Sequence, residues 1–127
     1  MSKRLLLTAA GLQNPNVAHT FLRLLGKSPQ DAHVLFVPTA AVTAEALRML
    51  AKCIDELYRV GINSENIAVY CLDRSLSYRE LQEFDAIYFA GGSATYLLAR
   101  VTAVGFANEL KSFVHAGGLF IGASAGS

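Results

Sequence analysis

The end of the chain holds a serine in a setting that suits nucleophilic catalysis. Gly122-Ala123-Ser124-Ala125-Gly126 has the pattern G-x-S-x-G and directly follows the apolar run Leu119 to Ile121. A buried strand followed by this pattern is typical of a nucleophile elbow, a tight strand-to-helix turn that exposes the serine hydroxyl. Small residues are needed there because the turn is crowded. The pentapeptide alone also fits a structural turn, but the strand before it favours Ser124 as a nucleophile.

A serine nucleophile needs hydrogen-bond donors for the oxyanion that forms when it attacks a carbonyl. The backbone amide of Ala125 is one candidate, because it would stand at the start of the next helix. Gly91-Gly92 is another, because it directly follows the apolar run Ala86 to Ala90 and lets the backbone turn its amides into a site. The dipeptide alone is more often a plain turn. Gly91-Gly92 follows one expected strand and Ser124 follows the next, and this pairing favours an oxyanion hole.

A general base is also needed to activate a serine, and the three histidines are poor candidates. All of them precede Ser124: His19 lies in an expected helix, His33 begins an expected strand and His115 ends an expected helix. A histidine at a helix C-terminus is favoured by the helix dipole without any catalytic role. In an elbow hydrolase the base comes from a loop after the nucleophile. We therefore expect none of the three to be the base.

Composition narrows the class of protein further. The chain has 127 residues, 53% hydrophobic and 17% charged, which predicts one globular domain over residues 1–127. The net charge of +1 predicts neither nucleic acid nor a membrane as partner. Apolar stretches are too short to span a bilayer or form a signal-peptide core, so we expect a cytoplasmic protein.

Cys53 and Cys71 lack metal spacing and are expected to be buried thiols. Neither a G-x-G-x-x-G fingerprint nor a phosphate loop occurs, and we expect no cofactor and no metal.

Short apolar runs alternate with amphipathic segments along the chain. The expected strands cover residues 4–8, 33–37, 67–72, 86–90 and 119–121. The expected helices cover residues 17–25, 43–60, 77–81, 96–101 and 107–115. Thr43 is expected to begin the second of these, and Ser77 with Glu80 to form a capping box at the start of the third. This alternation predicts an α/β fold with a mostly parallel sheet and helices on both faces. Ligands of such sheets bind beyond the carboxyl ends of the strands, where the double glycine and the elbow would both lie.

Four segments together resemble the serine peptidase family of aspartyl dipeptidase (peptidase E), which also includes cyanophycinases. They are Arg4 to Thr8, Val34 to Ala40, Asp85 to Gly92 and, most specifically, Gly117 to Ser127. The resemblance implies a flavodoxin-like, three-layer fold similar to class I glutamine amidotransferases, with serine in place of their elbow cysteine. It implies that Ser124 is the nucleophile, that the amides of Gly92 and Ala125 form the oxyanion hole, and that Gly91 and Ser93 contact the substrate. Family members cleave the peptide bond after an N-terminal aspartate without metal.

The chain departs from the family pattern in two places. The family usually has asparagine after the double glycine where this chain has Ser93, which bears on specificity for aspartate. The family's histidine and acidic partner lie beyond the serine, together with further strands. We therefore expect residues 1–127 to be the N-terminal part of such an enzyme, incomplete at the C-terminus and inactive alone.

Three hypotheses about function follow from these residues. The first is a serine-type dipeptidase that forms an acyl-enzyme on Ser124 and acts on small peptides. The second is a truncated, non-catalytic domain that self-associates, for example as a homodimer, if the fifth strand lies at or near a sheet edge. The third is an amidotransferase-like domain.

Overall fold

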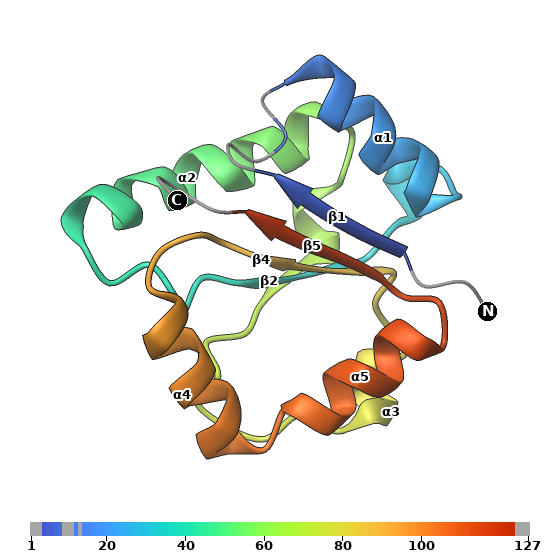
Figure 1. Cartoon of the computed structure of the whole chain (residues 1–127). Coiled ribbons are helices and arrows are strands. Elements are labelled where there is room, and N and C mark those ends of the chain that lie inside the picture. The colour runs from blue at the N-terminus through green and yellow to red at the C-terminus, as the bar shows by residue number, and fades with distance from the viewer. Residues whose placement is uncertain (1–3, 9–11, 13, 124–127) are drawn as a thin grey trace.

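Five parallel strands form one sheet, with helices on both of its faces (Figure 1). The computed structural model describes residues 4–8, 12 and 14–123. The strands are β1 (Arg4–Thr8), β2 (Val34–Val37), β3 (Ile67–Val69), β4 (Ala86–Phe89) and β5 (Leu119–Ala123). Their order across the sheet is β1-β5-β4-β2-β3. The predicted α/β class with a parallel sheet and two helical layers is confirmed.

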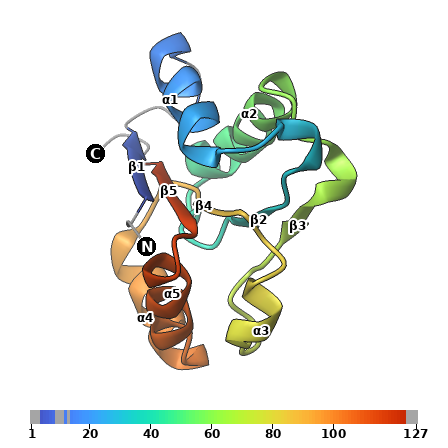
Figure 2. The same ribbon diagram turned by 90° about the vertical axis from the view of Figure 1, so that its right-hand side faces the viewer.

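Helices cover both faces of this sheet (Figure 2). On one face lie α1 (Pro15–Leu25) and α2 (Ala44–Arg59), and on the other lie α3 (Tyr78–Leu81), α4 (Ala94–Val104) and α5 (Ala107–His115). Two short 3-10 helices, η1 (Pro29–Asp31) and η2 (Ser64–Asn66), precede β2 and β3. No helix in the described ranges has both the length and the apolarity needed to cross a bilayer.

Local sequence determines where the main helices begin. The Thr43 hydroxyl accepts a hydrogen bond from the Ala46 amide at 3.1 Å and begins α2 as predicted. Ser77 and Glu80 form the predicted capping box at the start of α3. Helix α1 begins two residues earlier than predicted, because Asn14 caps it and Pro15 suits the first turn.

Two hydrophobic clusters, one on each face of the sheet, form the core. Strands β2 and β4 are buried along their whole length, as expected for strands that are covered on both faces. The cluster under α1 and α2 is centred on Phe21, Phe36, Leu57, Tyr88 and Ile121. The cluster under α3, α4 and α5 is centred on Val37, Ile87, Phe89, Phe106 and Phe113.

Asp85 aligns the amino ends of three strands. Its carboxylate accepts a hydrogen bond from the His33 amide at 2.8 Å and forms an ion pair with Lys27 at 3.0 Å. Its carbonyl accepts a hydrogen bond from the Leu119 amide at 3.1 Å. Because the amino ends of β2, β4 and β5 are aligned, the carboxyl ends of β4 and β5, which carry the predicted site, are aligned as well.

The first strand, whose apolar run predicts burial, is not buried. Within the described sheet β1 is the edge strand, and its Leu5 and Leu7 are 54% and 75% exposed. The fifth strand lies one position in from this edge, because β1 pairs along its outer side. Hydrophobic patterning identifies strands but does not specify their lateral order, so neither feature could be read from the sequence.

Candidate active site

The double-glycine turn and the end of β5 lie at the same edge of the sheet. Phe89, the last residue of β4, pairs with Gly122 of β5, and Thr8 of β1 pairs with Ala123. The turn Gly91-Gly92 follows β4 with one residue between, and β5 ends at Ala123. The predicted nucleophile Ser124 and the predicted oxyanion donor Ala125 come next in the sequence and lie outside the described residues. The described chain thus includes the strand that leads to the elbow and the neighbouring turn.

Gly92 packs directly against the backbone of the β2–α2 turn. Its φ is 146°, a conformation that residues with a side chain rarely adopt. A Cβ atom at this position would lie 2.0 Å from the carbonyl oxygen of Ala40 and 2.5 Å from its carbonyl carbon. The next amide, that of Ser93, donates a hydrogen bond to the same Ala40 oxygen at 2.7 Å. This packing requires glycine at position 92 whether or not the Gly92 amide binds an oxyanion.

The amide of Gly92 meets the first requirement of an oxyanion donor. In the described part of the chain, none of the hydrogen bonds uses this amide, whereas the next amide, that of Ser93, is occupied. Gly91 is partly exposed and Gly92 is exposed, so a ligand can approach the turn. An amide that is fixed in place and free of an internal partner is suited to stabilising a developing negative charge.

Ser93 has a structural role that the sequence analysis did not assign. Its hydroxyl accepts a hydrogen bond from the Tyr96 amide at 3.1 Å and caps the N-terminus of α4. A capping hydroxyl still has its own hydrogen to donate, so contact with a substrate is compatible with the cap. The cap also places the positive end of the α4 dipole at this edge of the sheet.

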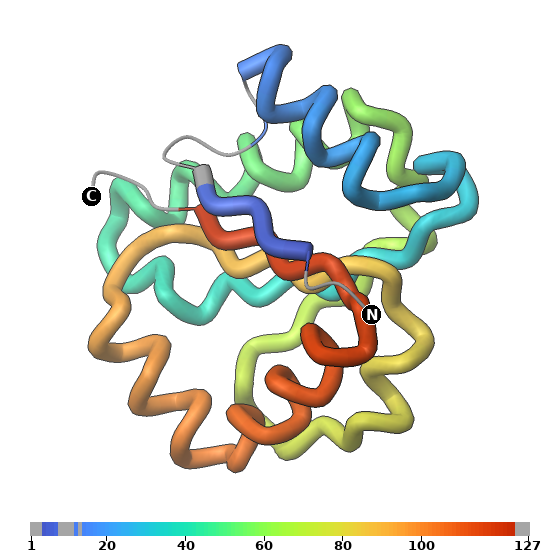
Figure 3. The backbone as a smooth tube through the Cα atoms, turned by 45° about the vertical axis from the view of Figure 1, so that its right-hand side comes forward, coloured from blue at the N-terminus to red at the C-terminus, as the bar shows by residue number. Residues whose placement is uncertain are grey.

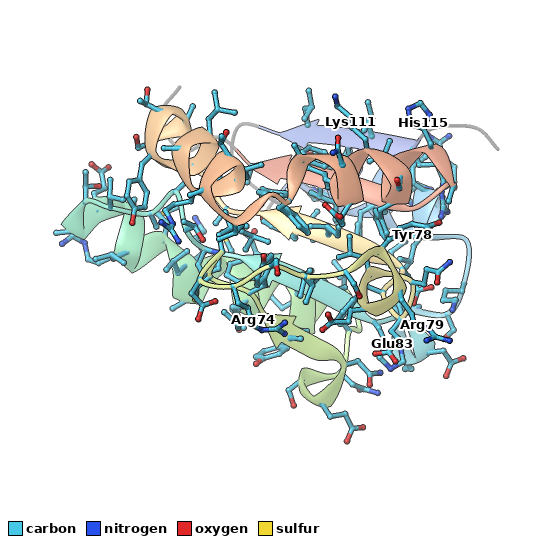
Figure 4. All side chains as sticks on the ribbon, turned by 90° about the horizontal axis from the view of Figure 1, so that it is seen from below. Arg74, Tyr78, Arg79, Glu83, Lys111 and His115 are labelled. Atoms are coloured by element: carbon cyan, nitrogen blue, oxygen red, sulfur yellow. The ribbon has the colours of Figure 1, made fainter. Side chains whose placement is uncertain are left out.

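Two of the three histidines lie at the amino ends of the strands, opposite to the end that carries the double-glycine turn. His33 immediately precedes β2, and its amide is bonded to Asp85. His115 is the last residue of α5 and comes shortly before β5 begins; Figure 4 shows it at the end of α5 that is distant from α4. The five residues of β5 span about 13 Å at about 3.3 Å per residue. Both residues therefore lie at the end of the strands opposite to Ala123, the last described residue before the predicted nucleophile. His19 is exposed on α1.

A buried glutamate, which sequence reasoning missed, holds the connection that follows β1. Glu56 of α2 is only 7% exposed, and its Oε1 accepts a hydrogen bond from the Leu12 amide at 2.9 Å. Its Oε2 is buried and has no partner among the described residues. The signal was present, because Glu56 directly precedes the core residue Leu57 on the apolar face of α2. The contact fixes Leu12 near the pocket of about 350 Å³ between α1 and α2.

The remaining reactive side chains lie apart from the double-glycine turn. Burial raises the pKa of the Cys53 thiol, and burial also raises the pKa of the neighbouring Tyr88 hydroxyl. Cys71 is exposed, so the expectation of two buried thiols is wrong for this residue. It follows the short strand β3 at the far edge of the sheet. Across residues 4–8, 12 and 14–123, no three His, Cys, Asp or Glu side chains gather as they would around a metal ion.

Comparison with known proteins agrees with this arrangement. The model of peptidase family S51 matches residues 5–127, and the chain belongs to this family. A crystal structure of a protein from Listeria monocytogenes EGD-e, provisionally named peptidase E, superimposes with a TM-score of 0.78 at 25% identity. A peptidase from an acI-B1 actinobacterium superimposes with a TM-score of 0.68 at 20% identity, which supports the fold alone.

The similarity covers unequal shares of the chains compared. The alignments include 99% of this chain, but only 60% of the Listeria chain and 55% of the actinobacterial chain. The described fold therefore corresponds to somewhat more than half of each of those proteins. Among curated proteins, none matches the sequence.

Proposed function

We propose that this chain carries the nucleophile and the oxyanion hole of a serine exopeptidase that cleaves the peptide bond after an N-terminal aspartate. In this proposal the Ser124 hydroxyl attacks the scissile carbonyl and forms an acyl-enzyme, which water then hydrolyses. The amides of Gly92 and Ala125 stabilise the oxyanion. Membership of peptidase family S51 supports the reaction class.

The observation that carries the proposal is the register between β4 and β5. Phe89 pairs with Gly122, so the turn that holds the Gly92 amide and the residue that precedes the elbow end their strands together. An oxyanion donor must lie within about 3 Å of the reacting oxygen, which requires the two segments to be neighbours. A sheet in which another strand separated β4 from β5 would not support this function.

Specificity for aspartate has weaker support, drawn from two sources. The Listeria protein carries the name peptidase E, and the sequence resembles that family. Helices α2 and α4 both begin at the carboxyl edge, where their positive dipole ends favour a substrate carboxylate. The hydroxyl hydrogen of Ser93 is a further donor for that carboxylate in this proposal.

Hydrolysis of matched dipeptides by the protein isolated from its source tests the proposal. We expect Asp-Leu to be cleaved with a higher kcat/KM than Asn-Leu, which has the same shape without the charge. Ser124→Ala should abolish cleavage of both, and Ser127→Ala, three residues away, should not. Unchanged turnover in Ser124→Ala at an unchanged melting temperature would show that G-x-S-x-G is only a tight turn here. Equal cleavage of the two dipeptides would reject only the specificity for aspartate and would leave the assignment of Ser124 as the nucleophile in place.

A further inference from the structure

Helix α4 begins directly after the double-glycine turn, so its position determines where the Gly92 amide lies. Ser93 is the N-cap of this helix, and its amide donates a hydrogen bond to the Ala40 carbonyl at 2.7 Å. The Gly92 amide is one residue before this cap. A shift of α4 along its axis would therefore carry the amide away from the oxyanion that it stabilises in the proposed function.

A second hydrogen bond holds α4 further along its length. Nη2 of Arg100 donates to the carbonyl oxygen of Leu72 at 2.8 Å. Arg100 follows Ser93 by about two helical turns, so both residues lie on the same side of α4. Arg100 is partly buried, and none of the carboxylates in the described residues forms an ion pair with it. Its charge therefore strengthens the hydrogen bond to Leu72.

Leu72 presents this carbonyl from an unusual backbone conformation. Its φ is 56°, and within the described chain it is the one residue other than glycine with a positive φ. This left-handed conformation is unfavourable for a residue with a Cβ. The Leu72 side chain is fully buried in the cluster under α3, α4 and α5, which holds the conformation in place. Strained backbone gathers at functional sites, so the conformation points to a role for the carbonyl that Arg100 contacts.

The connection between β3 and α3 (residues 70–77), which contains Leu72, is firmly packed. Tyr70, Leu72 and Leu76 are all buried, and the Tyr70 amide donates to the Phe36 carbonyl of β2 at 2.9 Å. The Tyr70 ring packs edge-on against Phe106, just beyond the end of α4, with ring centroids 5.2 Å apart. Figure 3 shows this connection (yellow-green) and α4 (orange) on the same side of the sheet. The connection is therefore a fixed support for α4.

We propose that Arg100 is a positioning residue of the peptidase: through α4 it holds the Gly92 amide where that amide stabilises the oxyanion. This inference rests on the proposed function, in which Gly92 is an oxyanion donor. Arg100 lies about 10 Å along the helix axis from Ser93, at about 1.5 Å per residue, so it acts through the helix and not on the substrate. The oxyanion exists only after attack on the carbonyl. Loss of the Arg100 contact should therefore lower kcat and leave KM unchanged.

Hydrolysis of Asp-Leu by the protein isolated from its source and by its variants, well below their melting temperatures, tests this role. Arg100→Met keeps the aliphatic stem and loses the donors. It should lower kcat about tenfold, a part of the 10²–10³-fold or so that is lost when an oxyanion donor is removed, with KM unchanged within about twofold. Arg100→Lys retains a charged donor and should restore part of kcat. Arg74→Met is the matched control: Arg74, labelled in Figure 4, lies on the same connection in an exposed ion pair with Glu80, and its loss should leave kcat at the parent value.

Hydrogen exchange at the Ser93 amide provides a second readout, which does not depend on turnover. Exchange of this amide, which is bonded to Ala40, should be faster in Arg100→Met than in the parent. Exchange of the Ala46 amide, in the first turn of α2, should be equal in both proteins. Unchanged exchange at Ser93 in Arg100→Met would overturn the proposal, because α4 would then be held without Arg100.

The kinetic results separate this inference from the proposed function. Parental kcat in Arg100→Met, or an equal loss of kcat in Arg74→Met, would overturn the positioning role. A rise in KM that accounts for the whole loss of activity would overturn it as well. If Ser124→Ala cleaves Asp-Leu as the parent does, the proposed function is wrong and this inference is rejected with it. If Ser124→Ala is inactive and Arg100→Met is unimpaired, only this inference is wrong.

Discussion

Replacing Gly92 with alanine tests how the double-glycine turn is held. A side chain at φ 146° costs about 1–3 kcal/mol in backbone strain. The new Cβ would lie 2.0 Å from the Ala40 oxygen, so one of the two turns must move by about 1 Å, which costs a further 1–3 kcal/mol or so. The total of about 2–6 kcal/mol is a large share of the 5–15 kcal/mol or so that stabilises a typical domain.

Gly105 provides the matched control for this change. It caps α4 with φ 69°, and a Cβ there would meet no heavy atom within 4 Å. Gly105→Ala therefore measures the cost of the positive φ alone, about 1–2 kcal/mol. The measurement is the melting temperature and the urea midpoint of each variant of the 127-residue chain.

The expected difference between the two variants is large. At about 4 °C per kcal/mol for a chain of this length, Gly92→Ala should lower the melting temperature by about 8–24 °C. Gly105→Ala should lower it by about 4–8 °C. Equal shifts in the two variants would refute the contact with Ala40. Loss of activity in Gly92→Ala would not by itself identify an oxyanion hole, because the contact with Ala40 is sufficient to disturb the turn.

Three further predictions concern the rest of the fold. Cys71 should react with a thiol reagent within minutes in the native protein, whereas Cys53 should react only on unfolding because it is buried and its pKa is raised. Fast reaction of the one remaining thiol in native Cys71→Ser would contradict this. Ser77→Ala should destabilise the fold by about 1 kcal/mol through loss of the α3 cap. The hydrogen bond from the Ser77 backbone amide lowers the pKa of Glu80. The contribution of the Glu80 carboxylate to folding stability should therefore be present at neutral pH and lost as acid protonates it. Glu56→Ala should speed hydrogen exchange at the Leu12 amide while Glu56→Gln, which keeps an acceptor, should not; equal exchange in both would mean that the bond is not formed in solution.

The sequence predicted the elements well because their signals are local. The cap at Thr43 and the capping box at Ser77 and Glu80 are fixed by residues within one turn, and the structure confirms both. The buried strands β2 and β4 were predicted because runs that are apolar throughout occur where a strand is covered on both faces.

Features that depend on lateral neighbours could not be predicted in this way. The contact of Gly92 with Ala40 joins two turns that are about fifty residues apart, and only the strand order brings them together. The same order makes β1 the edge and leaves Leu7 exposed. Glu56 was missed because a glutamate is usually exposed, even beside a core residue, and its partner, the Leu12 amide, is 44 residues away in the sequence.

The central claim is that Ser124 is the nucleophile of a peptidase, and labelling with a fluorophosphonate tests it most directly. The protein isolated from its source is treated with the reagent, its intact mass is measured, and the adduct is mapped by peptide mass spectrometry. We predict one adduct per chain, located on Ser124 and absent from Ser124→Ala, with Ser127→Ala labelled at the parent rate. An adduct on another serine, or equal labelling of Ser124→Ala, would contradict the assignment.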